Sequence, residues 1–346
     1  MKTSCKIFIV STVLALFFAC DENSTSSQPL DEGFAKGADV GWVTEMESKG
    51  VKFYNAQGEE MECMTLLKSL GINSIRLRVW VNPSTHGNWC NKADVLVKAK
   101  RAHALGMRLM IIFHYSDWWA DPGQQNKPAA WKNFSIEELE NAVSEHTKDV
   151  LMALKKEKIS PEWVQIGNET DDGLLWETGK ASVSKKNYAG LIKAGYDAAK
   201  SVFPNTKVIV HVSNGYNNAL FRWNFDGLKA NGAKWDIIGM SLYPSYAKEK
   251  GYETWQEVNE ACLANIYDMI ERYGTEVMIC EVGMPYYQAE DCKKFLTDLI
   301  DKAKSVPNKK VLGVFYWEPQ CYNWGNYQLG AFDNTGKPTV AMDAFK

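Results

Sequence analysis

Residues 108–114 read RLMIIFH, and the four positions from Met110 to Phe113 are all apolar. A strand with one face in water alternates apolar and polar residues, whereas a strand covered on both faces is apolar at every position. This stretch therefore predicts a strand of a parallel sheet that is buried on both sides.

Seven similar apolar runs occur along the chain, and amphipathic stretches separate them. This alternation is typical of repeated strand-helix units around a parallel sheet. A barrel of eight such units needs roughly 250 residues and tolerates insertions, which the 346 residues accommodate. We therefore expect an α/β protein, a single-domain (β/α)8 TIM barrel. The eight predicted strands are Phe34–Asp39, Ser74–Val79, Arg108–His114, Trp163–Asn168, Lys207–His211, Ile237–Leu242, Val277–Glu281 and Val311–Trp317.

Helices are expected between these strands. Ser135 and Glu138 form the pattern of a capping box, and apolar residues follow them at helical spacing. Five more stripes of this kind are Met61–Leu70, Val95–Leu105, Ala189–Val202, Val258–Ile270 and Cys292–Ala303. No second domain or Pro/Gly-rich linker is apparent after residue 30.

The charge balance bears on the partners. The chain has 39 basic and 42 acidic side chains and no Lys/Arg-rich run that could neutralise a row of phosphates. We therefore expect no nucleic-acid partner, and we expect a monomer. The 13 Trp and 15 Tyr residues offer flat faces that suit sugar rings as well as a protein core.

The N-terminus has the features of an export signal. Lys2 and Lys6 precede the apolar run Ile7–Ala19, which is too short to span a bilayer and has the length of a signal-peptide core. The run ends at Cys20, and this arrangement resembles the lipobox of bacterial lipoproteins, in which the cysteine is acylated. Phe17 departs from the usual leucine, so an ordinary cleaved signal is the alternative.

Residues after Cys20 refine this expectation. Asp21 and Glu22 resemble the acidic export signal of surface lipoproteins in Bacteroidetes-like bacteria, and Asn23–Pro29 is polar and Ser-rich, as in a flexible tether. We expect a signal peptide at residues 1–19, a lipid-anchored tether at 20–32 and the barrel domain at 33–346. The expected location is the outer membrane at the bacterial cell surface, with the periplasm or secretion as alternatives.

Six cysteines remain when Cys5 is removed with the signal and Cys20 is acylated. They allow about fifteen complete pairings, so the sequence does not choose among disulfides. Cys280 lies in an apolar strand and is expected to be a buried small hydrophobic residue.

Two glutamates stand where catalytic residues of such a barrel are found. Polar residues at the C-terminal ends of the strands face the active site. Asn168 and Glu169 follow the fourth strand, and Glu281 closes the seventh. A buried carboxyl is costly without partners, so we expect both glutamates in one polar pocket. A salt bridge at a loop is the alternative for either glutamate alone.

Retaining glycoside hydrolysis needs such a pair, about 5 to 5.5 Å apart. Ionised Glu281 as nucleophile would raise the pKa of Glu169 and keep it protonated as the acid. Once Glu281 is esterified, Glu169 would act as the base.

Six segments carry a more specific resemblance. They are RLRVWVNP (Arg76–Pro83), HYSDWWADPGQQNKPAAW (His114–Trp131), WVQIGNET (Trp163–Thr170), GMSLYPSY (Gly239–Tyr246), EVGMPY (Glu281–Tyr286) and FYWEP (Phe315–Pro319). Together, and in this order, they resemble the endo-β-1,4-galactanases of glycoside hydrolase family 53, in clan A. The resemblance implies hydrolysis of galactan and galacto-oligosaccharides without a cofactor.

The resemblance also implies roles for other residues. Asn168 would bind the sugar 2-hydroxyl, Tyr243 would orient Glu281, and Trp317 would form the floor under the ring at the cleavage site. Arg78 would hold Glu281 ionised, with Arg76 and His114 close by. The alternative for these three is a structural role.

On the loop after the third strand, Asp117, Trp118 and Trp119 would form sugar subsites, although we expect at least one of the tryptophans to pack inward. We expect no metal, because Gly283–Glu290 lacks the acidic cluster of the calcium site found in some bacterial relatives, and no metal motif occurs elsewhere. A clan A enzyme acting on mannan, xylan or cellulose, and a surface glycan-binding lipoprotein without activity, remain the competing interpretations.

Overall fold

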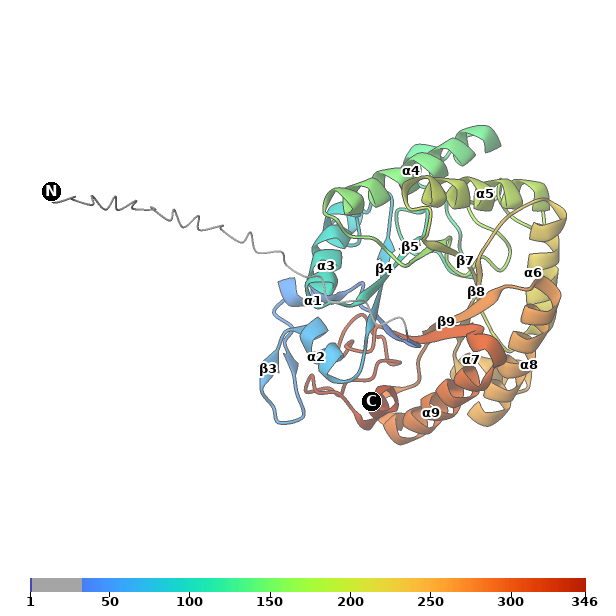
Figure 1. The fold of residues 1–346 in the computed structure, drawn as a ribbon. Coiled ribbons are helices and arrows are strands. Elements are labelled where there is room, and N and C mark those ends of the chain that lie inside the picture. The colour runs from blue at the N-terminus through green and yellow to red at the C-terminus, as the bar shows by residue number, and fades with distance from the viewer. Residues whose placement is uncertain (2–32) are drawn as a thin grey trace.

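The computed structural model describes residues 33–346, together with Met1. Eight parallel strands form a closed barrel in the order β1-β10-β9-β8-β7-β6-β5-β4, which confirms the predicted fold (Figure 1). All eight strands lie where the sequence predicted them, with ends that differ by at most two residues. They are β1 (Ala35–Asp39), β4 (Ser74–Val79), β5 (Arg108–Phe113), β6 (Trp163–Ile166), β7 (Lys207–Val212), β8 (Ile237–Leu242), β9 (Glu276–Val282) and β10 (Val311–Trp317).

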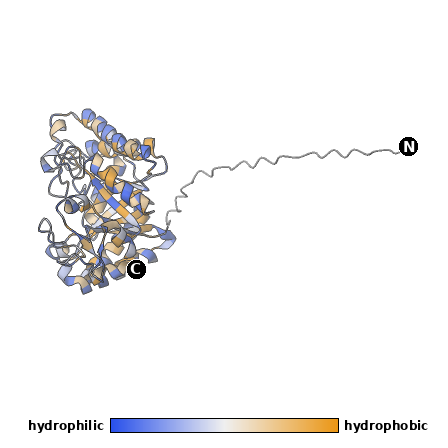
Figure 2. Cartoon of the chain, turned by 90° about the vertical axis from the view of Figure 1, so that its left-hand side faces the viewer, coloured by the Kyte–Doolittle hydropathy of each residue, from blue (hydrophilic) through white to orange (hydrophobic). Residues whose placement is uncertain are grey.

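Helices surround the barrel, and a two-stranded hairpin, β2 (Phe53–Tyr54) with β3 (Glu60–Met61), lies outside it. Apolar residues gather in the middle of the molecule, whereas the outer helices carry many hydrophilic residues (Figure 2). The α-helices are α1 (Val43–Ser48), α2 (Cys63–Ser69), α3 (Lys92–Ala104), α4 (Ile136–Lys156), α5 (Lys185–Val202), α6 (Asn218–Ala230), α7 (Pro244–Ala247), α8 (Trp255–Tyr273) and α9 (Ala289–Ser305). Short 3-10 helices occupy Ser84–His86, Ala129–Trp131, Lys248–Lys250, Tyr286–Gln288, Pro307–Lys309 and Val340–Phe345.

The start of α4 shows how the sequence fixes a helix. The Ser135 side chain accepts a hydrogen bond from the Glu138 amide, and the Glu138 carboxylate accepts one from the Ser135 amide, which is the expected capping box. Thr254 and Glu257 form a second box at α8. Because each box satisfies amides that the helix leaves unpaired, each stabilises its helix by about 1 kcal/mol.

The barrel interior has an apolar layer at its base. Phe315 packs there, and strand β1 passes close to it at Gly37, where a Cβ atom would lie 2.0 Å from the Phe315 ring. Gly37 pairs with Phe315 between the parallel strands β1 and β10, so only glycine fits at this position. The layer consists of Ala35, Met110, Trp163, Ile209, Ile237, Met278, Cys280 and Phe315. Above it, the same strands turn polar side chains inward, so the interior changes from a core into a site along the barrel axis.

The six cysteines among the described residues are buried and none of them forms a disulfide. Cys280 is the buried small hydrophobic residue that the sequence predicted, and burial raises the pKa of its thiol to about 12. In the part of the chain that the structure describes, no helix is long and apolar enough to cross a membrane. The predictions of the signal peptide, of acylation at Cys20 and of the tether concern residues outside the described part of the chain.

Candidate active site

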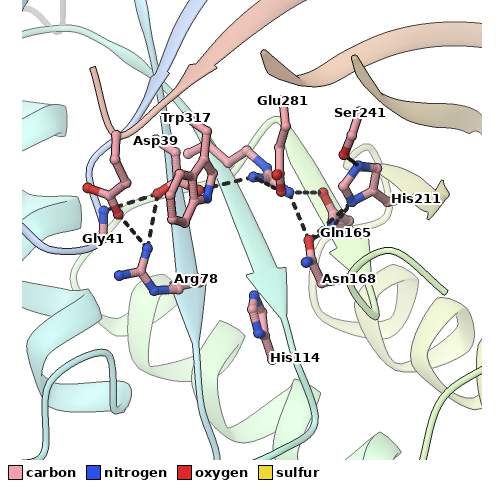
Figure 3. Close-up of polar contacts among 12 residues, drawn as sticks. Asp39, Gly41, Arg78, His114, Gln165, Asn168, His211, Ser241, Glu281 and Trp317 are labelled. Carbon is pink, nitrogen blue, oxygen red and sulfur yellow. Dashed lines mark hydrogen bonds and ion pairs between the residues drawn. The ribbon is translucent and has the colours of Figure 1, made fainter. Parts of the chain in front are cut away.

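Arg76 is the centre of a buried polar network in the upper barrel. One terminal nitrogen donates to Asp39 Oδ2 at 3.0 Å and to Glu281 Oε1 at 2.8 Å. The other donates to Gln165 Oε1 at 2.8 Å and to Asn168 Oδ1 at 3.1 Å. Because the side chain is fully buried on β4, these contacts fix one cation among groups from the ends of three other strands, β1, β6 and β9. The four partner residues are labelled in Figure 3.

Glu281 reaches this network because β9 is irregular. Met278 and Cys280 point into the barrel base, so simple alternation would turn Glu281 outward. The register between β8 and β9 shifts instead: Met240 pairs with Ile279, and Ser241 pairs with Glu281. Such a bulge re-aims side chains. It brings the Glu281 carboxylate to Arg76 and to the Tyr243 hydroxyl, which donates to Oε2 at 2.9 Å.

Glu169 comes from the turn that follows β6. Gly167 has a φ of +76°, and a Cβ atom there would lie 2.5 Å from the Thr170 side chain, so the turn requires glycine. Glu169 itself has a φ of +44°. Its Oε1 lies 2.7 Å from the Ser241 hydroxyl, and its amide donates to His211 Nδ1 at 3.4 Å.

The two carboxyl groups differ in charge environment. Burial raises the pKa of Glu169, and repulsion from Glu281 raises it further, to well above its ordinary value. Burial also raises the pKa of Glu281, but Arg76 opposes this rise at hydrogen-bond distance. Glu281 therefore loses its proton more easily than Glu169. These environments favour an ionised Glu281 beside a protonated Glu169.

The expectation that Arg78 holds Glu281 ionised is wrong. Arg78 pairs with Glu318 at 2.5 Å and with Asp39 at 3.5 Å, whereas Arg76 contacts Glu281. Both arginines point inward from β4, but the chain after β10 brings Glu318, with a φ of +48°, onto Arg78. Burial raises the pKa of Glu318 to about 7 even beside the arginine.

Four aromatic rings form one side of the site, which we call the aromatic wall: Trp42, Trp119, Trp317 and Tyr327. Trp42 contacts the other three edge-on, with ring centroids 5.0 to 5.8 Å apart. The Arg78 guanidinium lies 4.5 Å from the Trp119 ring centroid, so the cation supports the wall from below. Trp119 and Trp317 both line the cleft, and their sugar-binding roles stay predictions.

The cleft at this mouth has a volume of about 670 Å³. Its lining includes Glu169, Glu281, Asn168, Tyr243 and His114. Besides the aromatic wall, the remaining lining comes from Ala120, Asp121, Pro122, Ser213, Asn214, Tyr216, Ser241, Tyr246, Glu249, Lys250, Gly325 and Asn326. Aromatic faces beside carboxyl, amide and hydroxyl groups suit a chain of sugar rings.

Asp117 and Trp118, which were expected to form sugar subsites on the loop after β5, do not line this cleft, and their role as subsites stays a prediction. Asp117 accepts hydrogen bonds from the amides of Asn82 and Ala129 and so ties loops together. The Trp118 ring stacks on the His86 ring, with the ring centroids 3.6 Å apart.

His114 lines the cleft as expected. Its Nδ1 accepts hydrogen bonds from Trp80 Nε1 at 3.3 Å and from the Ala120 amide at 3.1 Å. Burial and the nearby arginines hold its pKa well below the ordinary value, so the ring is neutral.

Several residues of the site were not predicted. Trp42 and Asp39 follow or end the first strand, so the rule of strand ends could have found them. His211 ends the predicted strand Lys207–His211, so the same rule could have found it. Gln165 and Ser241 lie within apolar strands and reach the site because the barrel interior turns polar at their depth. In residues 33–346, no group of three or more His, Cys, Asp or Glu side chains is arranged to hold a metal ion. The absence of a metal remains a prediction.

A (β/α)8 barrel with two glutamates at strand ends, in a cleft walled by aromatic rings, defines a glycoside hydrolase type of site. The sequence matches the model described as Glycosyl hydrolase family 53 over residues 35–294 and 287–345. The chain therefore belongs to glycosyl hydrolase family 53, and it is a glycoside hydrolase.

Relatives agree with this membership. An endo-beta-1,4-galactanase of Bacillus subtilis is 31% identical, over 84% of this chain and 71% of the relative. A probable arabinogalactan endo-beta-1,4-galactanase A of Neosartorya fischeri is 31% identical, over 82% of this chain and 83% of the relative. The solved GH53 catalytic domain of Ignisphaera aggregans superposes with a TM-score of 0.80 at 28% identity, covering 92% of this chain and 97% of that domain.

Proposed function

We propose that the protein is a retaining endo-hydrolase of β-1,4-galactosidic bonds in pectic galactan, with Glu281 as nucleophile and Glu169 as general acid/base. The observation that carries the assignment is the difference in partners: Glu281 contacts the Arg76 cation, whereas Glu169 contacts the neutral Ser241. The nucleophile must be ionised and the acid must hold a proton, and these environments favour that division.

The substrate class rests on the relatives. The Bacillus subtilis and Neosartorya fischeri proteins are named as galactanases, and the chain covers most of each of them. The aromatic wall and the polar side chains opposite it supply apolar faces and hydrogen bonds for galactose rings. A reducing-sugar assay on pectic galactan, mannan, xylan and cellulose checks the choice. Preferred hydrolysis of another glycan would favour the competing clan A activity, and no hydrolysis of any would favour a binding protein.

Endo action follows from the open cleft. The cleft that holds the carboxyl pair is lined by Trp42, Trp119 and Trp317 and also by Tyr216 and Tyr246. Such a cleft binds an internal stretch of chain. Chromatography of the first few per cent of galactan hydrolysis should therefore show mixed oligosaccharides, whereas galactose alone would mean that the site is an exo pocket.

The stereochemistry of azide products tests the roles of the two glutamates. In Glu169→Ala, an activated aryl glycoside still forms the ester with Glu281, and azide attacks this ester to give the β-glycosyl azide. In Glu281→Ala, azide enters from the face that the carboxylate has vacated and gives the α-azide. Proton NMR distinguishes the two anomers. The opposite pattern would mean that the roles are reversed.

For location, we propose that Cys20 is acylated and tethers the barrel to the outer membrane at the cell surface. The lipobox-like sequence and the acidic Asp21 and Glu22 support this proposal. Cys20→Ala should release active protein from the membrane fraction. If the variant stayed in that fraction, the lipid-anchor proposal would be wrong.

A further inference from the structure

Two buried side chains stand behind Glu169 and have no place in the two-carboxyl mechanism. Ser241 on β8 is 1% exposed, and His211 on β7 is fully buried. The Ser241 hydroxyl lies 2.7 Å from Glu169 Oε1 and 2.8 Å from His211 Nε2. Ser241 and His211 meet end to end in Figure 3, and the far side of the imidazole faces Gln165 and Asn168.

The surroundings of His211 decide which ring nitrogen carries the hydrogen. The Glu169 amide points at Nδ1, and an amide N–H can only donate. Nδ1 is therefore an acceptor, and the hydrogen is on Nε2. Asn168 Oδ1 is also 3.1 Å from Nδ1, but this oxygen already accepts from Arg76 and Gln165, one donor for each lone pair. Burial and the Arg76 charge hold the pKa of His211 well below its ordinary value, so the ring carries a single hydrogen.

The direction of the remaining hydrogen bonds follows. His211 Nε2–H donates to Ser241 Oγ, and a hydroxyl has one hydrogen of its own. That hydrogen points to Glu169 Oε1. No other described residue forms a hydrogen bond to the second carboxyl oxygen, Oε2. The chain of donors therefore runs one way, from the imidazole through the hydroxyl to one chosen oxygen of the carboxyl group.

We propose that Ser241 and His211 are positioning residues that keep the acidic proton of Glu169 on Oε2, the oxygen that serves the substrate. This inference rests on the proposed function, which assigns Glu169 as the acid/base.

Ser241 holds Oε1 in both steps and transfers no proton. In the first step, the Oε2 proton moves to the glycosidic oxygen as the bond from C1 to that oxygen breaks and Glu281 bonds to C1. In the second step, Oε2 takes a proton from water while the water oxygen bonds to C1 and the ester bond between Glu281 and C1 breaks.

The test uses substrates that differ in their need for the acid. Ser241→Ala should lower kcat/KM on galactan and on a phenyl β-galactobioside by about 10- to 100-fold, which is part of the roughly 10²- to 10⁴-fold that a positioned acid contributes. A dinitrophenyl β-galactobioside, whose leaving group departs without a proton, should change by no more than about twofold. General damage to the fold would lower all three alike, and that result would overturn the proposal.

Two variants serve as controls. Ser241→Thr keeps the hydroxyl and should recover most of the activity on the phenyl glycoside. Ser74→Ala removes another buried serine, which is the first residue of strand β4 and lies at the end of the barrel away from the cleft. There Ser74 Oγ donates to Asn73 Oδ1. It should leave the ratio of the two aryl activities unchanged. A changed ratio there, or no recovery in Ser241→Thr, would contradict a specific role of the hydroxyl.

A spectroscopic measurement tests the donor chain without turnover. In protein labelled with ¹⁵N-histidine, the His211 signals, assigned from their loss in His211→Gln, should show hydrogen on Nε2 and none on Nδ1. The opposite tautomer would overturn the proposal while leaving the galactanase assignment intact. If the unmodified protein cleaves neither galactan nor the aryl glycosides, the proposed function is wrong, and the positioning role falls with it.

Discussion

At the scale of single residues, the site depends on which arginine faces which carboxylate. Arg76 and Arg78 are two positions apart on β4 and both are fully buried. Removing one partner of such a buried network costs about 3 to 5 kcal/mol, because a charge is left without compensation. The two arginines therefore both stabilise the fold, but only Arg76 contacts Glu281.

Arg76→Gln should change the pH dependence of hydrolysis. Arg76 lowers the pKa of Glu281, and the nucleophile must be ionised, so losing the cation raises this pKa and moves the acid limb of the kcat/KM profile to higher pH. Activity at the optimum should fall by about 10²- to 10³-fold, as for other lost electrostatic contacts in active sites. Arg78→Gln is the matched control, with thermal melting to confirm folding. A larger limb shift in Arg78→Gln would contradict the assignment.

Sequence reasoning identified the residues at strand ends better than their pairing. Glu169 and Glu281 were found because their positions follow from the strand pattern. The pairing of Arg78 with Glu318 was not, since it depends on a left-handed residue just after β10. The bulge in β9 was also invisible, because a strand that is apolar on both faces has no alternation from which a register shift could be read.

At the scale of elements, the strands and most helices followed from apolar runs and stripes. Helix α6 was missed, although Phe221, Phe225 and Leu228 lie at helical spacing. Asn224 interrupts that stripe: it is buried on the same helix and donates to the Thr170 carbonyl at 2.7 Å. A polar residue that supports the turn after β6 therefore concealed the amphipathic pattern of the helix.

Helix α4 contributes a pH-sensitive packing contact. His146 lies against Phe113, Tyr115 and Trp131, and its Nε2 is buried without a hydrogen-bond partner among the described residues. Burial lowers its pKa from 6.5 to about 4. The folded state thus binds a proton at His146 less readily than the unfolded chain does. The contribution of neutral His146 to the free energy of unfolding is therefore fully present above pH 6.5 and is lost as the pH falls through about 4.

His146→Phe should reduce this loss. One proton corresponds to about 1.4 kcal/mol per pH unit between the two pKa values, so the free energy of unfolding of the variant should fall less steeply below pH 6.5. Urea unfolding at pH 7, 6 and 5 measures the difference. His103→Phe, at an exposed position of α3, is the control. Equal slopes for His146→Phe and the unmodified protein would show that His146 is not a source of acid sensitivity.

At the scale of the whole molecule, the barrel closes where the first strand, β1, pairs with the last strand, β10. Strand β1 pairs with β10 from Ala35 to Asp39 and with β4 from Gly37 to Asp39. It also delivers Asp39 to the network of Arg76 and Arg78. The fold and the site therefore depend on the same short strand near the start of the described residues.

Two shortened chains test this dependence. A chain that begins at Gly33 keeps all of β1 and the hydrogen bond from Arg108 to the Gly33 carbonyl, so it should fold, melt cooperatively and hydrolyse galactan as well as a chain that begins at Cys20. A chain that begins at Trp42 lacks β1. It leaves the facing edges of β4 and β10 unpaired and two buried arginines without Asp39, so it should be insoluble or melt without a cooperative transition. Circular dichroism melting and a galactan assay on the three chains measure both outcomes. Loss of activity in the chain from Gly33 would place the start of the catalytic domain before residue 33, and a cooperative, active chain from Trp42 would show that barrel closure by β1 is dispensable.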